Sequence, residues 1–199
     1  MSEIMQNSHA KVHALLSKRW SPRAFDAEKA VEQEKLLMVL EAARWAPSCF
    51  GDEPWRFVVS NRFEDEVSWQ AMLALLAPKN QEWAQHAPVL ILACADSEFR
   101  QNTKPNRWAQ YDTGQASMSL CLQATALGLV SHQMGGFDGE KAREVLHIPI
   151  QFTPVAAIAV GYQGDINSLD EGFQATERAA RKRQPMSDNF FSGIWGHGI

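Results

Sequence analysis

Two continuous apolar runs constrain the fold more than any other feature of the sequence. They are Pro88–Ala95 (PVLILACA) and Pro154–Tyr162 (PVAAIAVGY). Each run has the length of a β-strand and contains no charged residue, which is typical of a strand whose two faces are both buried. Trp55–Ser60 and Val130–Met134 are predicted as further strands. Segments with helical spacing of apolar residues lie around the strands, over residues 9–17, 32–46, 64–76, 108–127 and 138–146.

This alternation of helices and buried strands predicts one domain of the α+β class (α/β-type layered), with a central sheet flanked by helices on both sides. We expect Asp138 to be the N-cap of the last helix and Gly128 to end the longest one, residues 108–127. That helix is rich in small residues, which favours tight packing or a subunit interface. Residues 80–86 are ambiguous. The tail, residues 163–199, is polar and irregular, and either wraps a partner or is partly disordered.

Composition narrows the class of protein. The 199 residues carry a net charge of −4, which argues against a general nucleic-acid binder. The three cysteines form no CxxC pair, and the histidines form no HxxxH or HExxH pattern, so neither a disulfide framework nor a metal site is predicted. The first residues are polar, and no apolar run reaches the roughly 20 residues of a membrane span. We therefore expect a cytoplasmic protein that contacts no membrane.

Two basic clusters stand out against this acidic background. The segment Lys18–Phe25 (KRWSPRAF) places Arg19 and Arg23 at i and i+4 with Ser21 between them. Guanidinium groups at that spacing suit a phosphate or another anion. The second cluster, Arg181–Pro185 (RKRQP), lies near the C-terminus. Each cluster could equally be a solvated surface segment. The two could meet around one phosphate, although the sequence does not establish that they do.

Other candidate residues carry weaker signals. Ser48 and Cys49 follow a helix and a proline, so their hydroxyl and amides could bind the edge of a heteroaromatic ring. A nucleophilic role for Cys49 is disfavoured, because no family signature surrounds it. His132 lies in or beside a short strand and is interpreted as a core residue with its hydrogen bonds satisfied. The Gly135–Gly136 pair allows close approach of the backbone to a ligand, or is a plain turn.

Taken in order, these segments resemble the FMN-dependent nitroreductase family over almost the whole chain. RWSPRAF is similar to its N-terminal R-x-S-x-R/K-x-F element, and ARWAPSCFGDEPWRFVV to its A-P-S-x-x-N-x-Q-P-W-x-F element. The stretch WAQYDTGQASMSLCLQATALGLVSHQMGGFD resembles the long central helix and the turn that follows it. PVAAIAVGY and RKRQP complete the pattern. The combination is specific, whereas each motif alone is not.

The resemblance implies a mixed sheet, an obligate homodimer with FMN at the subunit interface, and a tail (about 163–199) that wraps the partner. It also implies reduction of nitroaromatic compounds, quinones or related electron acceptors with NADH or NADPH, in a ping-pong cycle that needs no catalytic side chain. Pro47, Ser48 and Cys49 would reach the flavin from the second subunit. The implied cofactor-binding residues are Arg19, Trp20 (through its backbone), Ser21, Arg23, Pro47, Ser48, Cys49, Gln133, Met134, Gly135, Gly136, Arg181 and Arg183.

The sequence departs from the family pattern at two positions. Gly51 stands where the family usually has Asn, and Glu53 where it has Gln. Asn80 lies near the position of another family flavin contact. These changes leave open a flavin enzyme with a specialised metabolite substrate, a flavin-binding protein with little turnover, and a relative that has lost FMN. Aromatic residues such as Phe50 or Trp108 could shape the substrate face.

Overall fold

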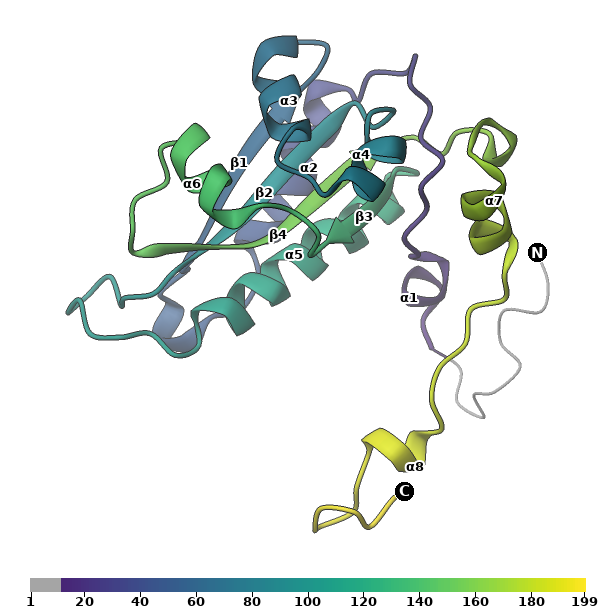
Figure 1. Cartoon of the computed structure of the whole chain (residues 1–199). Helices are drawn as coiled ribbons and strands as arrows, with labels where there is room; N and C mark the ends of the chain where they lie inside the picture. The colour runs from purple at the N-terminus through teal and green to yellow at the C-terminus, as the bar shows by residue number, and fades with distance from the viewer. Residues whose placement is uncertain (1–11) are drawn as a thin grey trace.

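A four-stranded sheet forms the centre of the molecule (Figure 1). The computed structural model describes residues 12–199, so the start of the helix expected over residues 9–17 lies outside the described part. In space the strands follow the order β1-β2-β4-β3, so the two apolar runs, which become β2 and β4, occupy the middle of the sheet. The bounds are β1 Trp55–Asn61, β2 Val89–Asp96, β3 Val130–Met134 and β4 Phe152–Gly161.

The predicted α+β class is confirmed, but the sheet of this chain is not mixed. All three strand pairs, β1 with β2, β2 with β4 and β3 with β4, are antiparallel. The apolar character of β2 and β4 indicates only that both faces are buried. It carries no information on strand direction, because central antiparallel strands covered on both sides require the same residues.

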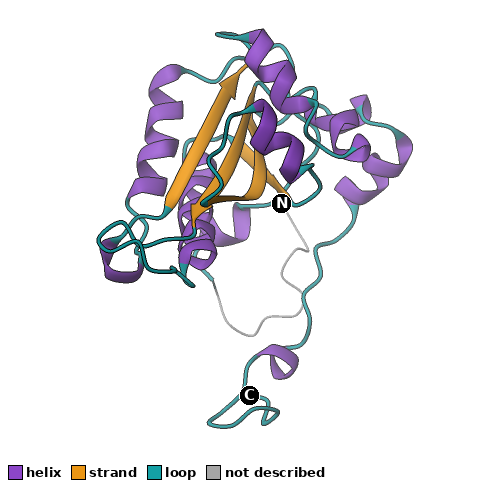
Figure 2. Ribbon diagram, turned by 60° about the vertical axis from the view of Figure 1, so that its left-hand side comes forward, coloured by secondary structure: helices purple, strands orange, loops and turns teal. Residues whose placement is uncertain are grey.

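Helices cover both faces of the sheet, as predicted (Figure 2). Alternate residues of β2 divide between two apolar clusters: Leu90 and Leu92 join one, Val89 and Ile91 the other. The first cluster packs against α3, α4 and α6, and the second packs against α2 and α5. Successive side chains of β2 point to opposite faces of the sheet, so this one strand contributes to the apolar layer on each side. The helix bounds are α2 Gln33–Arg44, α3 Glu66–Leu73, α4 Pro78–Ala84, α5 Ala109–Ala126 and α6 Gly139–Val145.

Local signals explain where several helices begin and end. Asp138 is the N-cap of α6, and its carboxylate accepts a 2.9 Å hydrogen bond from the Lys141 amide. Gly128 follows α5 with φ +76°, a conformation that favours glycine. Both caps are confirmed. The ambiguous segment, residues 80–86, overlaps α4, which begins at Pro78, where the fixed φ of proline suits the first helical turn.

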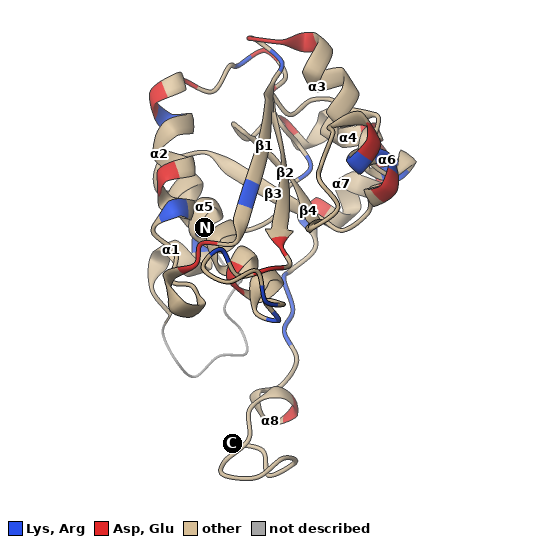
Figure 3. Ribbon diagram, turned by 90° about the vertical axis from the view of Figure 1, so that its left-hand side faces the viewer, with Lys and Arg blue, Asp and Glu red and all other residues tan. Residues whose placement is uncertain are grey.

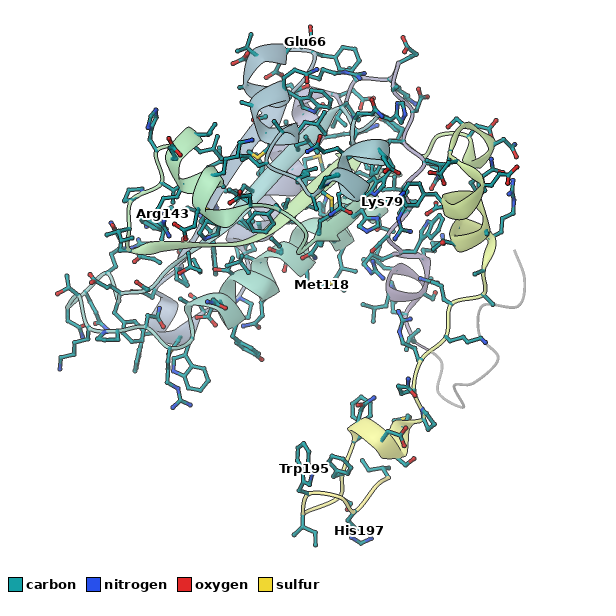
Figure 4. All side chains as sticks on the ribbon, in the orientation of Figure 1. Glu66, Lys79, Met118, Arg143, Trp195 and His197 are labelled. Atoms are coloured by element: carbon teal, nitrogen blue, oxygen red, sulfur yellow. The ribbon has the colours of Figure 1, made fainter. Side chains whose placement is uncertain are left out.

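The C-terminal tail is more ordered than predicted. It contains the 3₁₀ turn η2 (Ile166–Ser168), the helix α7 (Glu171–Arg178) and the short helix α8 (Met186–Asn189). Helix α7 contacts Arg23 in the loop that follows α1 (Ala14–Lys18), and the chain then extends away from the sheet to α8 (Figure 1). Trp195 and His197 lie at the far end of this arm, well away from α5 (Figure 4). We call residues 179–199 the C-terminal arm.

Candidate functional site

The basic N-terminal loop, residues 19–25, is anchored on the sheet by its apolar end. Phe25 is buried and stacks on Trp83 of α4, with 6.1 Å between ring centroids. The Pro22 carbonyl lies 2.9 Å from Nδ1 of His132 on β3. Since a carbonyl oxygen can only accept, Nδ1 carries the proton and donates. His132 is thus a partly buried residue with a satisfied hydrogen bond, as interpreted from the sequence.

The second basic cluster reaches this loop across almost the whole length of the chain. Arg181 donates from Nη1 to the carbonyl of Arg19 at 2.7 Å, and from Nη2 to the carbonyl of Ser17. The blue stretch between α7 and α8 in Figure 3 contains Arg181 and its basic neighbours. The structure therefore brings together the two basic clusters that the sequence analysis suggested could meet around one phosphate.

The region where Arg181 contacts residues 17–19 carries positive charge that nearby carboxylates do not neutralise. Among the described residues, the Arg19 guanidinium donates to the Ser21 hydroxyl alone, at 3.4 Å, and the Arg183 guanidinium to the Lys182 carbonyl alone. Burial, followed by the nearby charges of Arg19 and Arg183, lowers the pKa of Arg181. Within residues 12–199, no carboxylate forms an ion pair with Arg19, Arg181 or Arg183. We call these three residues the arginine cradle. Such a cluster suits a phosphate group.

Arg23 lies in the same loop but has a different partner. Its guanidinium lies 3.5 Å from the Glu177 carboxylate of α7, and its amide donates to the same oxygen at 3.0 Å. The ring of Phe173, also on α7, lies 5.5 Å from the guanidinium carbon. Arg23 is therefore neutralised within the chain, unlike the arginine cradle.

The end of β3 supplies backbone groups next to this region. Met134 is buried, whereas Gly135 is exposed. The carbonyl of Gly136 accepts from the Ala77 amide at 2.9 Å and from Nδ2 of Asn80 at 3.0 Å. In the described part of the chain, the amides of Gly135 and Gly136 donate no hydrogen bond, so both can serve a ligand.

Two contacts on α5 separate the predicted residues into two groups. Gln133 donates to Sγ of Cys121 at 3.3 Å, whereas the Cys49 amide donates to Asp112 at 2.9 Å. Nine residues of α-helix separate Asp112 from Cys121, which corresponds to about 14 Å of rise. The Cys49 loop therefore lies away from Gln133 of the same chain. The resemblance assigned these residues to the second subunit's flavin.

The Cys49 loop carries an exposed aromatic side chain and two non-glycine residues with positive φ. Phe50 has φ +57° and is 82% exposed, with its ring edge-to-face on Phe99. Glu53 also has positive φ, and its amide donates to Oγ of Ser48 at 3.0 Å. Within residues 12–199, Cys49 makes no hydrogen bond to a histidine, and no cluster of three metal-ligating side chains occurs.

The sequence analysis missed Glu177 because it treated the tail as irregular. Helical spacing in the tail was the available signal, since Phe173 and Glu177 lie at i and i+4 and meet Arg23 together. None of the helices over residues 12–199 is both long and apolar enough to span a bilayer.

A layered fold that carries an arginine cluster without carboxylate partners among the described residues suits a phosphorylated ligand. Comparison with known proteins identifies the family. The model of the nitroreductase family matches residues 16–162. This chain therefore belongs to the nitroreductase family, as its motifs predicted, and is an oxidoreductase of that family.

Solved structures agree with this assignment. The crystal structure of an oxidoreductase containing FMN is 35% identical, with a TM-score of 0.90 and coverage of 98% of both chains. A nitroreductase family protein from Clostridium difficile 630 is 29% identical, with a TM-score of 0.69, over 90% of this chain and 96% of that one. An oxygen-insensitive NADPH nitroreductase from Helicobacter pylori is 25% identical over 69% of this chain and 80% of its own length.

Proposed function

We propose that this protein is an FMN-dependent NAD(P)H oxidoreductase whose arginine cradle holds the FMN phosphate. The observation that carries the proposal is the contact between Arg181 and the Arg19 backbone, which gathers three guanidiniums that lack carboxylate partners within the described residues. A phosphate dianion would supply the missing negative charge. The close structural similarity to an oxidoreductase containing FMN supports this choice among phosphorylated ligands.

The remaining predicted residues would hold the rest of the cofactor. Ser21 and the backbone of Trp20 lie in the same loop as Arg19. The free amides of Gly135 and Gly136 can donate to the flavin ring edge, and Gln133 and Met134 precede them on the strand. Hydrogen bonds from backbone amides tune the electronics of a flavin without any titratable group.

Bound FMN would supply the redox chemistry of a ping-pong cycle between NADH or NADPH and a nitroaromatic compound, a quinone or a related acceptor. The protein would bind and orient both substrates in turn and needs no side chain as acid or base. The exposed ring of Phe50 can contribute an apolar surface to the acceptor.

A homodimer would complete the site. The Cys49 loop contacts α5 at Asp112, about 14 Å along the helix from Cys121, which Gln133 contacts, so a second copy would bring its own Pro47, Ser48 and Cys49 to the flavin. The outer side of α5 offers a close-packing surface, since a Cβ added at the exposed Gly114 would meet no atom within 4 Å. The C-terminal arm carries apolar residues that a partner would cover: Met186, Phe190, Ile194, Trp195 and Ile199.

An absorbance spectrum of the purified protein, recorded anaerobically before and after NADH and then NADPH, tests the proposal. We expect the visible bands of oxidised flavin to bleach with at least one nucleotide. Bands that persist with both would favour a flavin-binding protein with little turnover or with a specialised metabolite substrate. Gly51 and Glu53, which replace the usual amide side chains, are the residues that favour this second candidate. If the protein shows no bound flavin bands after incubation with FMN and removal of the free cofactor, the proposal would be overturned. A cytoplasmic location stays a prediction.

A further inference from the structure

Glu177 is a buried acid that joins the C-terminal tail to the basic N-terminal loop. Its side chain is only 1% exposed. One carboxylate oxygen, Oε1, accepts from the Arg23 amide at 3.0 Å and lies 3.5 Å from the Arg23 guanidinium. The other oxygen, Oε2, is buried and has no hydrogen-bond partner among the described residues.

Stability alone is a poor explanation for an acid in this position. A buried carboxylate with one unsatisfied oxygen loses hydration that its partners only partly replace. Burial accordingly raises the pKa of Glu177, against the opposing influence of Arg23. A leucine on the same helix face would avoid this cost, so the carboxylate is expected to serve the site that it touches.

The contacts of the tail and of the loop have a regular spacing. Glu177 contacts Arg23, and four residues later Arg181 contacts Arg19 and Ser17. The two segments therefore run antiparallel, with these two contacts four positions apart in each segment. Fixing Glu177 on Arg23 restricts where Arg181 can lie relative to Arg19. Phe173, packed over the Arg23 guanidinium, keeps α7 in the same register.

We propose that Glu177 is a positioning residue: it fixes the tail on the N-terminal loop so that Arg181 and Arg19 form the phosphate cradle, and it withdraws Arg23 from the phosphate-binding set. The proposal rests on the proposed function and deepens it, because it assigns which arginines recognise the phosphate. It means that Glu177, without any contact to the ligand, sets the preference for FMN over riboflavin, which lacks the phosphate.

Binding of FMN and of riboflavin to the apoprotein, followed by quenching of flavin fluorescence, tests the assignment. For Glu177→Ala we expect about tenfold weaker FMN binding and a riboflavin affinity changed by less than about twofold. Glu177→Gln should preserve the preference for FMN, because its amide oxygen can still accept from the Arg23 amide. Glu171→Gln, at an exposed position on the same helix, is the matched control and should behave like the parent protein.

The outcomes separate the two proposals. Equal loss of both flavins in Glu177→Ala, or unchanged FMN affinity, would overturn the positioning role. Failure of the parent protein to bind either flavin would instead overturn the proposed function. Should Glu177→Ala not fold, Glu177→Asp keeps the charge and shortens the reach by one methylene. Its FMN affinity should then fall while that for riboflavin stays constant, and an unchanged FMN affinity would contradict the proposal.

Discussion

Arg181 donates a 2.7 Å hydrogen bond to the backbone carbonyl of Arg19, a residue 162 positions earlier in the chain. The contact uses a neutral acceptor and so leaves both guanidinium charges available. Burial and the charges of Arg19 and Arg183 already disfavour the charged form of Arg181, as its lowered pKa indicates. An anion that binds here would relieve this mutual repulsion.

Replacing Arg181 should therefore weaken FMN binding through the phosphate. For Arg181→Ala we expect a loss of about tenfold to a hundredfold, the range for one hydrogen bond between charged groups. Riboflavin affinity should change little. Lys182→Ala, at the exposed neighbouring position, is the control. Fluorescence titration measures both ligands, and an Arg181→Ala protein that retains the parent FMN affinity would exclude Arg181 from the site.

Arg23→Ala should affect stability more than phosphate recognition. Removing the guanidinium leaves the Glu177 carboxylate buried without its ion-pair partner, and we expect a loss of about 2 kcal/mol at neutral pH. Because the folded-state pKa of Glu177 is raised, its protonation favours the native state, so the loss should shrink as the pH falls through that pKa. Urea unfolding at neutral and acidic pH measures the effect.

The same variant separates two assignments of Arg23. The sequence analysis placed Arg23 at the FMN phosphate, whereas its ion pair with Glu177 argues for an indirect role. A selective loss of FMN binding as large as that of Arg181→Ala would return Arg23 to the phosphate-binding set.

His132 should make the folded state sensitive to mild acid. Burial, followed by the charges of Arg23 and Arg19, lowers the pKa of His132 to about 4, although the hydrogen bond to Pro22 opposes this shift. Because the folded-state pKa is lowered, neutral His132 contributes fully to the free energy of unfolding above pH 6.5. This contribution is lost as the pH falls toward 4. Relative to His132→Gln, the parent protein should lose about 2 kcal/mol between pH 7.5 and pH 5. If the parent protein and His132→Gln lose stability in the same way between pH 7.5 and pH 5, His132 is not the group responsible.

A charge on the outer side of α5 should disrupt the proposed dimer. Met118 lies on α5 one turn after Gly114, and it projects away from the sheet (Figure 4). Met118→Arg would force a guanidinium into an apolar interface and should shift the protein from dimer to monomer in sedimentation velocity. Val67→Arg, on the exposed side of α3, is a control and should remain dimeric. A monomeric parent protein that retains flavin would contradict the shared site.

The sequence predicted the layers and most elements, because burial of β2 and β4 and the helical spacing around them are local properties. Strand direction was not predictable, since an apolar run reports burial alone. The meeting of Arg181 with Arg19 was expected only through the family resemblance, because no local pattern indicates which distant cluster a basic loop will meet. Glu177 was overlooked for a related reason: it becomes informative only when α7 is placed against residues 19–25.

The antiparallel contact between residues 17–23 and residues 177–181 has a consequence for biosynthesis. The N-terminal loop emerges from the ribosome early in synthesis. Its partner, residues 177–181, is made only when nearly the entire polypeptide has been synthesised. A fragment ending before Arg181 would have the complete sheet and only part of the arginine cradle. Retention of flavin would then distinguish finished chains from truncated ones.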